Sequence, residues 1–181
     1  MPSFPVIVPT MRAALLVALA APVALVIAAV APGAWIAAPA LGGAILVLVL
    51  ADALLAGSTD HVHLSAPADV EVGATSEVQL FAGFSGGSRS AVDCAMSTDI
   101  RLFPGGRATG RLLPRQGGGW IAAIAMTPSR RGTGTIDRLW LRWTGPLGLG
   151  ARMMRRDENR PIRVWPNISE VRSPALQTFM R

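Results

Sequence analysis

The sequence predicts a two-helix transmembrane hairpin followed by an all-β antiparallel sandwich, and two observations carry this prediction. Charge is distributed unevenly: residues 13–56 contain one charged side chain, Asp52, whereas residues 61–181 contain sixteen arginines and nine acids. The apolar residues also change their pattern, from two long uncharged runs to short alternating segments after residue 60. Long apolar runs suit lipid, and alternation suits strands with one buried face, so we expect the two parts in different solvents.

The two apolar runs are each long enough to cross a bilayer as a helix. Ala13–Ala31 carries no charge, and the run Ala34–Ala56 is interrupted only by Asp52. A hydrocarbon core of about 30 Å takes about 20 helical residues, and Pro32-Gly33 between the runs is a turn signal. We therefore expect an N-terminal tail over residues 1–11 and a hairpin over residues 12–57, with helices at about 13–31 and 34–56.

A cleaved signal peptide is the alternative to the first membrane helix. Ala29-Val30-Ala31 has the small-x-small form of a cleavage site, and cleavage after Ala31 would release an exported β-domain. The uncharged run is longer than the usual apolar core of a signal peptide, which has about 7–15 residues. A second apolar run also follows at once, so the hairpin is favoured.

The positions of charged residues indicate which side of the membrane the domain occupies. Two spans return the chain to its starting side, and the positive-inside rule places arginine-rich flanks in the cytoplasm. Asp60, Asp69 and Glu71 precede the first downstream arginine, Arg89, so this flank gives the weaker signal. Asp52 lies about one helical turn before the end of the second run. There we expect it to reach interfacial water, and a proton or ion path is the alternative.

Residues 58–168 are expected to form the sandwich, of the immunoglobulin or fibronectin type. Side chains that alternate between apolar and polar point to opposite faces of a strand. Glycine and proline clusters between the alternating segments are typical of an antiparallel all-β domain. The clearest alternating segments are 78–80, 92–96, 139–143 and 162–165. Residues 169–181 resemble the start of a further, truncated element.

The composition excludes several chemistries, and no catalytic constellation is present. The chain has no lysine, so it has neither a phosphate-loop lysine nor a Schiff-base lysine. Cys94 is the only cysteine, which excludes an internal disulfide, and its place in an alternating segment predicts a buried apolar role. We expect a protein that is not an enzyme and needs no cofactor.

His61 and His63 support the alternative of an exported or envelope hydrolase that depends on a metal. Two histidines at this spacing would share one face of a strand, and imidazole is a common metal ligand. The sequence offers no evident third ligand. Surface histidines are therefore the favoured interpretation.

Arg152, Arg155 and Arg156 begin a basic stretch that is partly offset by Asp157 and Glu158. Such a patch binds anionic lipid headgroups or an acidic protein partner. No aromatic-and-basic motif accompanies the charge, so nucleic acid is not an expected partner. A solvated face with local ion pairs is an equally good interpretation.

Three motifs in order resemble the bacterial family called domain of unknown function 58. They are Ser129–Gly132, which precedes a strand, then Gly145–Leu149, and then Ile162–Asn167. The motif residues, which we interpret as structural, are Arg130, Arg131, Gly132, Pro146, Leu147, Gly148, Leu149, Val164 and Pro166. Two positions depart from the family pattern: Gly145 stands where aspartate is usual, and Trp165 stands where tyrosine is common.

This resemblance implies a membrane-anchored interaction module. Family members begin with two membrane helices, continue through a β-rich region, and are similar downstream to von Willebrand factor type A domains. The Asp-x-Ser-x-Ser metal loop of such domains is absent from this sequence, so no metal site is carried over. The resemblance also implies a place in the bacterial inner membrane and a partnership with a MoxR-type AAA ATPase in complex assembly.

Overall fold

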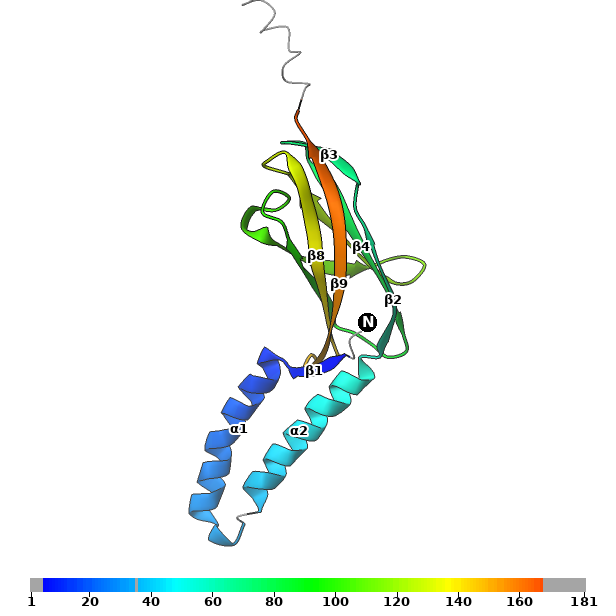
Figure 1. Cartoon of the computed structure of the whole chain (residues 1–181). Coiled ribbons are helices and arrows are strands. Elements are labelled where there is room, and N and C mark those ends of the chain that lie inside the picture. Colours follow the sequence, from blue (N-terminus) through cyan, green and yellow to red (C-terminus); the bar gives the residue numbers. More distant parts are fainter. Residues whose placement is uncertain (1–4, 35, 168–181) are drawn as a thin grey trace, which may run out of the picture. The chain divides into compact units, whose positions relative to one another are not determined.

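The computed structural model describes residues 5–34 and 36–167, which form two long helices followed by a predominantly antiparallel β-sheet (Figure 1). The elements are β1 (Val6–Pro9), α1 (Met11–Val30), the 3-10 turn η1 (Pro32–Ala34), α2 (Ala37–Leu55), β2 (Ser58–Ser65), β3 (Asp69–Glu71), β4 (Ser76–Ser85), β5 (Ala91–Thr98), the 3-10 turn η2 (Pro104–Gly106), β6 (Arg107–Pro114), β7 (Trp120–Met126), β8 (Gly132–Thr144) and β9 (Gly150–Trp165).

The strands of the described residues are hydrogen-bonded in the order β1-β9-β8-β5-β6-β7-β4-β2. Strand β1 pairs antiparallel with the start of β9, where Val6 lies opposite Met153. Strand β3 pairs in parallel with the end of β9, where Val70 lies opposite Val164. The prediction that all strands are antiparallel is therefore wrong for β3, because no local pattern in a three-residue strand fixes the direction in which it pairs with a distant partner.

The chain divides into two compact units, and several strands contribute residues to both of them. Unit 1 comprises Met1–His61, Ala82–Asp93 and Leu141–Arg155. Unit 2 comprises Val62–Phe81, Cys94–Trp140 and Arg156–Arg181.

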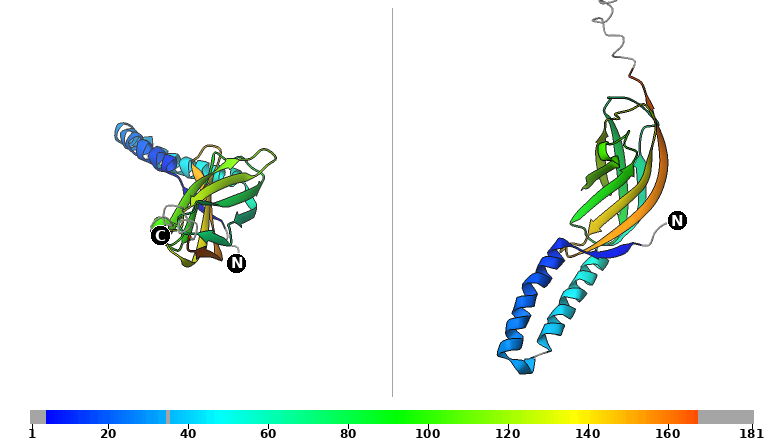
Figure 2. Two further views of the ribbon diagram at one scale, coloured as in Figure 1. Left: turned by 90° about the horizontal axis from the view of Figure 1, so that it is seen from above. Right: turned by 60° about the vertical axis from the view of Figure 1, so that its left-hand side comes forward.

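Unit 1 contains the two helices, which pack side by side as an antiparallel pair (Figures 1 and 2). Each helix is long and apolar enough to cross a membrane. Ala13 is the one buried residue among those described in α1, and long apolar side chains stand outward, with Leu25 71% and Val30 80% exposed. The helices begin and end within a few residues of the predicted bounds, and the proline–glycine turn lies in η1.

A buried tryptophan, Trp143, packs in the β-strand part of unit 1. Trp143 is fully buried, its ring meets Phe84 edge to face at 5.5 Å between centroids, and its indole N–H donates to the carbonyl of Gly57 at 3.3 Å. Burying an indole requires a partner for its N–H. This bond therefore fastens β8 to the first residues after α2.

Unit 2 has a core built by the predicted alternation. In β4, Val78 and Leu80 are fully buried and the polar residues beside them are exposed. Cys94 is buried in β5, as its position in an alternating segment predicts. The largest fully buried side chains of this unit come from several strands: Leu80, Met96, Leu102, Leu112, Met126, Ile136, Leu139 and Ile162. The expected truncated element at 169–181 lies outside the described residues.

Candidate functional site

The loop Gly145–Gly150 joins β8 to β9 in unit 1 and contains the second motif of the family resemblance. The amide of Gly148 donates to the carbonyl of Gly145 at 3.1 Å, which closes the predicted turn. Gly148 has φ +71°, a backbone conformation that favours glycine. The amide of Gly145 donates to the carbonyl of Gly150 at 3.0 Å, so a hydrogen bond joins the two ends of the loop.

Asp52 of α2 is fully buried, and its carboxylate caps this loop. One oxygen, Oδ1, accepts from the amide of Leu147 at 2.8 Å. The other, Oδ2, accepts from Leu149 at 2.7 Å and from Gly150 at 2.9 Å. A carboxylate removed from water needs such donors, because an unpaired buried charge is very costly. The expectation that Asp52 reaches interfacial water is therefore wrong: amide donors, 95 to 98 residues away in sequence, replace the water.

Thr10, the N-cap residue of α1, also binds this loop. Its hydroxyl donates to the carbonyl of Gly148 at 2.6 Å, and its amide donates to the carbonyl of Leu149 at 3.0 Å. The same hydroxyl oxygen accepts from the amide of Ala13 at 3.4 Å as a helix N-cap. Both helices are thus anchored to one loop of the β-strand part of unit 1.

Two glycines of the loop are required by the close approach of α2. A Cβ added to Gly145 would lie on the backbone oxygen of Asp52 and 2.5 Å from its carboxyl carbon. A Cβ added to Gly150 would lie 2.7 Å from the amide nitrogen of Ala53. This approach explains why glycine, rather than aspartate, suits position 145 in this chain: the Asp52 carboxyl group already occupies the place where a side chain would stand.

Three arginines of unit 1 surround this end of the helix pair. Arg12 donates to the carbonyl of Leu147 at 3.4 Å, and Arg152 donates to the carbonyl of Gly57 at 2.8 Å. Arg89 donates to the carbonyls of Gly86 and Ser85. Burial lowers the pKa of the Arg89 guanidinium below its ordinary value, and the negative charge of Asp60 offsets part of this shift.

The three arginines that the sequence grouped make different contacts. Arg152 lies in unit 1 beside Gly57, as described above. Arg155 is exposed on β9, also in unit 1. Arg156 belongs to unit 2, where it donates to the carbonyl of Val62 at 2.7 Å and pairs with Glu158 at 3.0 Å. Arg89, which lies far from the basic stretch in sequence, reaches Gly57 together with Arg152, and Arg12 lies at the Leu147 carbonyl. One feature of the sequence pointed to a position for Arg12 at the end of the helix pair: it immediately precedes the first apolar run.

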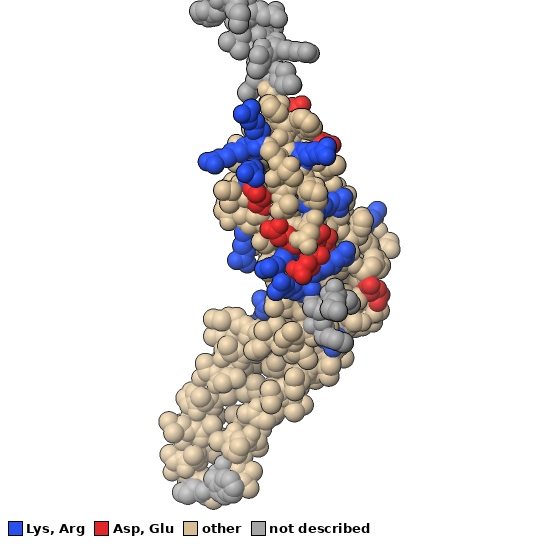
Figure 3. All heavy atoms as spheres, in the orientation of Figure 1, with Lys and Arg blue, Asp and Glu red and all other residues tan. Residues whose placement is uncertain are grey.

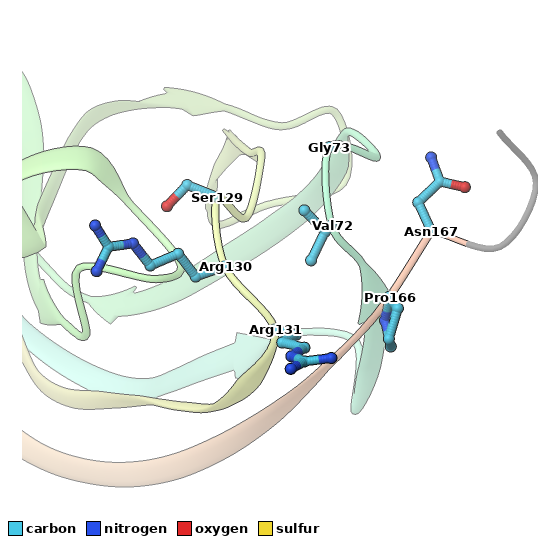
Figure 4. Close-up of a pocket in the computed structure, with 7 residues that line it drawn as sticks. All are labelled: Val72, Gly73, Ser129, Arg130, Arg131, Pro166 and Asn167. Carbon is cyan, nitrogen blue, oxygen red and sulfur yellow. The ribbon is translucent and has the colours of Figure 1, made fainter. Parts of the chain in front are cut away.

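The first and third motifs meet at a pocket in unit 2 (Figure 4). The pocket has a volume of about 460 Å³ and is lined by Val72, Gly73, Ser129, Arg130, Arg131, Pro166 and Asn167. The backbone around it is already paired, since Gly73 donates to Pro128 at 2.9 Å and Ser129 donates to Arg101 at 2.9 Å. Its chemistry therefore comes from the exposed Arg130 and Arg131, whose guanidinium groups extend in different directions in Figure 4.

The remaining motif residues have positions typical of fold-making residues. Gly132, with φ +123°, is the first residue of β8, and Val164 is buried in β9 opposite Val70. In the β8–β9 loop, Pro146 and Leu147 are exposed and Gly148 is buried.

Both histidines of the alternative metal hypothesis are exposed in β2. The imidazole of His61 lies directly over Gly83, where it would overlap any added Cβ. Within residues 5–34 and 36–167, no group of three or more histidine, cysteine, aspartate or glutamate side chains is arranged to hold a metal ion. No geometric observation therefore favours the hydrolase.

Comparison with protein-family models gives no match, and comparison with curated proteins gives none either. Among solved structures, a match is the CARDB domain of a Pyrococcus furiosus protein, crystallised in complex with di-metal ions. It is 15% identical, with a TM-score of 0.36, and the match covers 61% of this chain and 96% of that chain. A likeness of this size carries no argument about the chemistry of this chain.

Proposed function

We propose that this chain is a membrane-anchored, non-enzymatic protein-interaction module. Helices α1 and α2 span the bacterial cytoplasmic membrane as a hairpin. The β-strand part is an immunoglobulin- or fibronectin-like domain in the cytoplasm, where it works with a MoxR-type AAA ATPase in complex assembly. The observation that carries the proposal is the outward apolar surface of the two helices.

Water is an unfavourable solvent for this surface. Each large apolar side chain left in water forgoes about 1.5–3 kcal/mol of burial free energy. The exposed large apolar residues of α1 and α2 are Met11, Leu15, Leu16, Val17, Leu19, Val23, Leu25, Val26, Val30, Leu46, Val47, Leu48, Leu50, Leu54 and Leu55. Their sum is far larger than the stability of an ordinary domain, about 5–15 kcal/mol. A bilayer covers all of them at once, and helices of 20 and 19 residues have the length to span it.

The arginines support a cytoplasmic domain. The positive-inside rule counts basic residues close to the ends of spans. Arg12 is the second residue of α1, and Arg89 and Arg152 both reach Gly57, two residues after the end of α2. Folding therefore adds two positive charges to a flank that looked weak along the chain. In Figure 3 the helical part shows no charged side chain on the face in view.

The interaction role rests on the family resemblance and on the pocket of unit 2. The residues of two motifs line that pocket, and its two arginines are exposed. Exposed guanidinium groups beside a concave surface suit an acidic segment of a partner protein. This partner assignment is an analogy at the level of the family.

Membrane anchoring and orientation are tested by alkaline extraction and cysteine labelling. In a Cys94→Ala background, Gly33→Cys marks the turn between the helices, and Gln116→Cys marks the exposed β6–β7 turn. A membrane-impermeant maleimide applied to cells with a permeabilised outer membrane should label Gly33→Cys and spare Gln116→Cys. Reversed labelling would contradict the cytoplasmic domain. Release of the chain by alkaline carbonate, or a mature N-terminus at Pro32, would contradict the anchor.

The partnership is tested separately, by co-purification with a MoxR-type AAA ATPase from the same bacterium. We expect wild-type protein to retain the ATPase and the Arg130→Ser, Arg131→Ser double variant to retain less. The matched control is Arg115→Ser, which removes an exposed arginine from the β6–β7 turn of the same unit. Equal retention by all three proteins would exclude the pocket as the docking surface.

A further inference from the structure

Two arginines from different parts of unit 1 meet at Gly57, the second residue after α2. Arg152 in β9 donates from Nη1 to the Gly57 carbonyl at 2.8 Å. Arg89, between β4 and β5, places Nη2 only 2.7 Å from the point where a Cβ on Gly57 would stand. Arg12 lies at the same end of the helix pair, because it contacts Leu147 in the loop that Asp52 caps.

The hydrogen bonds of these arginines leave their positive charge uncompensated. Arg12, Arg89 and Arg152 donate to the backbone carbonyls of Leu147, Ser85, Gly86 and Gly57, which carry no formal charge. The Nε atoms of Arg89 and Arg152 are buried without a hydrogen-bond partner in the described part of the chain. A buried guanidinium N–H without an acceptor is costly, and two neighbouring cations repel each other.

The carboxylates of unit 1 do not remove this excess. Asp52 is saturated by three amide donors, and Asp60 is the one acid that acts on Arg89 through its charge. Unit 1 contains five arginines, at 12, 89, 142, 152 and 155, against three aspartates, at 52, 60 and 93. The end of the helix pair is therefore a site of net positive charge.

The position of this site along the helix pair identifies the source of the anion. Helix α2 is apolar up to Leu55 apart from the capped Asp52, and the arginines lie immediately beyond it. If the hairpin spans the membrane, Arg12, Arg89 and Arg152 lie at the depth of the lipid phosphates. A guanidinium forms paired hydrogen bonds with a phosphate, which suits this ligand better than a single-point contact.

We propose that Arg89 and Arg152 bind the phosphate of an acidic phospholipid headgroup, with Arg12 at the edge of the site. This inference rests on the proposed membrane anchoring. The phosphate supplies the negative charge that the backbone carbonyl acceptors of these arginines lack. The bound lipid fixes the end of α2 relative to the loop Gly145–Gly150. Arg155 and Arg156, which the sequence grouped with Arg152, are not members of this site.

The experiment measures the thermal unfolding of the full chain in neutral detergent during titration with lipid. The added probes are phosphatidylglycerol, phosphatidylcholine and inorganic phosphate. We expect phosphatidylglycerol to raise Tm in a saturable manner and the other two to have little effect. Binding of a ligand to the folded state alone raises stability by mass action, so the midpoint of the titration reports affinity.

The variants are Arg89→Gln, Arg152→Gln, their combination, and Arg115→Gln as the matched control from unit 2. Each site arginine contributes about 1 kcal/mol, so we expect about a fivefold loss of affinity for either single variant and about a thirtyfold loss for the double variant. Arg115→Gln should retain wild-type affinity. The Arg89→Lys, Arg152→Lys pair keeps the charge and should fall between the double glutamine variant and wild type.

Three outcomes would overturn the inference. Wild-type protein with no preference for phosphatidylglycerol over phosphatidylcholine has no acidic-lipid site, even if carbonate extraction shows that the chain is anchored. An equal response to inorganic phosphate would indicate a site for soluble anions. A loss for Arg115→Gln equal to that of the double variant would indicate nonspecific charge attraction. The wild-type lipid comparison decides the question if the glutamine variants fail to fold.

Discussion

Replacing Asp52 with alanine removes the acceptor for three backbone amides. These are the amides of Leu147, Leu149 and Gly150, at 2.7–2.9 Å from the carboxylate oxygens. Leaving a buried donor unsatisfied costs about 1–3 kcal/mol. The Gly150 amide is buried, whereas water can reach the loop near Leu147, whose side chain is 53% exposed. We therefore expect Asp52→Ala to lower the free energy of unfolding by about 3–5 kcal/mol.

Asp52→Asn provides a graded comparison at the same position. Its single carbonyl oxygen can replace Oδ2, which accepts from Leu149 and Gly150. The NH2 group of the asparagine then faces the N–H of Leu147, and two donors cannot form a hydrogen bond with each other. The bonds from Leu149 and Gly150 are also weaker, because their acceptor no longer carries a charge. We expect a loss of about 2 kcal/mol, smaller than that of the alanine variant.

The assay is urea unfolding of the full chain in detergent, followed by tryptophan fluorescence, to which the buried Trp143 contributes. Glu77→Ala is the matched control, because it removes an exposed carboxylate from β4. It should change the free energy of unfolding by less than about 0.5 kcal/mol. A similarly small change for Asp52→Ala would refute the capping role. A loss of ion or proton movement with unchanged stability would favour the path that the sequence left open.

The remaining predictions concern the helix ends and the core. Gly145→Ala should lower the free energy of unfolding by about 1–3 kcal/mol, because the added Cβ overlaps the backbone oxygen of Asp52. The comparison for backbone strain alone is Gly73→Ala, since φ is positive there but no atom lies within 4 Å of the added Cβ. Equal losses for the two variants in urea unfolding would contradict the close approach. Thr10→Val should lower the free energy of unfolding by about 1–2 kcal/mol, because it removes the N-cap hydrogen bond and the bond to Gly148. An unchanged midpoint in urea unfolding would contradict this role of Thr10. Ile136→Ala should cost about 2–5 kcal/mol because the side chain is fully buried, and a smaller loss would indicate that the core can collapse around the vacancy.

The order of the elements could be read from the sequence because it depends on local patterns. The two helices follow from uncharged runs of bilayer length, and the segments at 78–80, 92–96, 139–143 and 162–165 all lie within observed strands. The turn at Gly145–Gly148 follows from proline and glycine at fixed turn positions. Each of these signals is contained within one continuous stretch of the chain, so no knowledge of distant contacts is needed.

Short strands that owe their existence to a distant partner could not be read in the same way. Strand β1 has four residues and lies in what the sequence presents as a tail. Strand β3 has three residues and forms a parallel pair. Both strands form by pairing with residues of β9 that lie more than ninety positions further along the chain, and no local period specifies that partner.

Hydropathy and alternation are properties of consecutive residues, so they predict two helices of membrane length before a β-rich, arginine-bearing domain. The roles of individual residues depend on contacts that exist only in the folded chain. Folding turned Asp52 from an interfacial carboxylate into the cap of a distant loop, and it left no room for a side chain at Gly145. It also brought Arg89 and Arg152 together at Gly57. Hydrogen bonding and charge act through space, so residues far apart in the chain acquire their chemistry only when folding brings them within a few ångströms of one another.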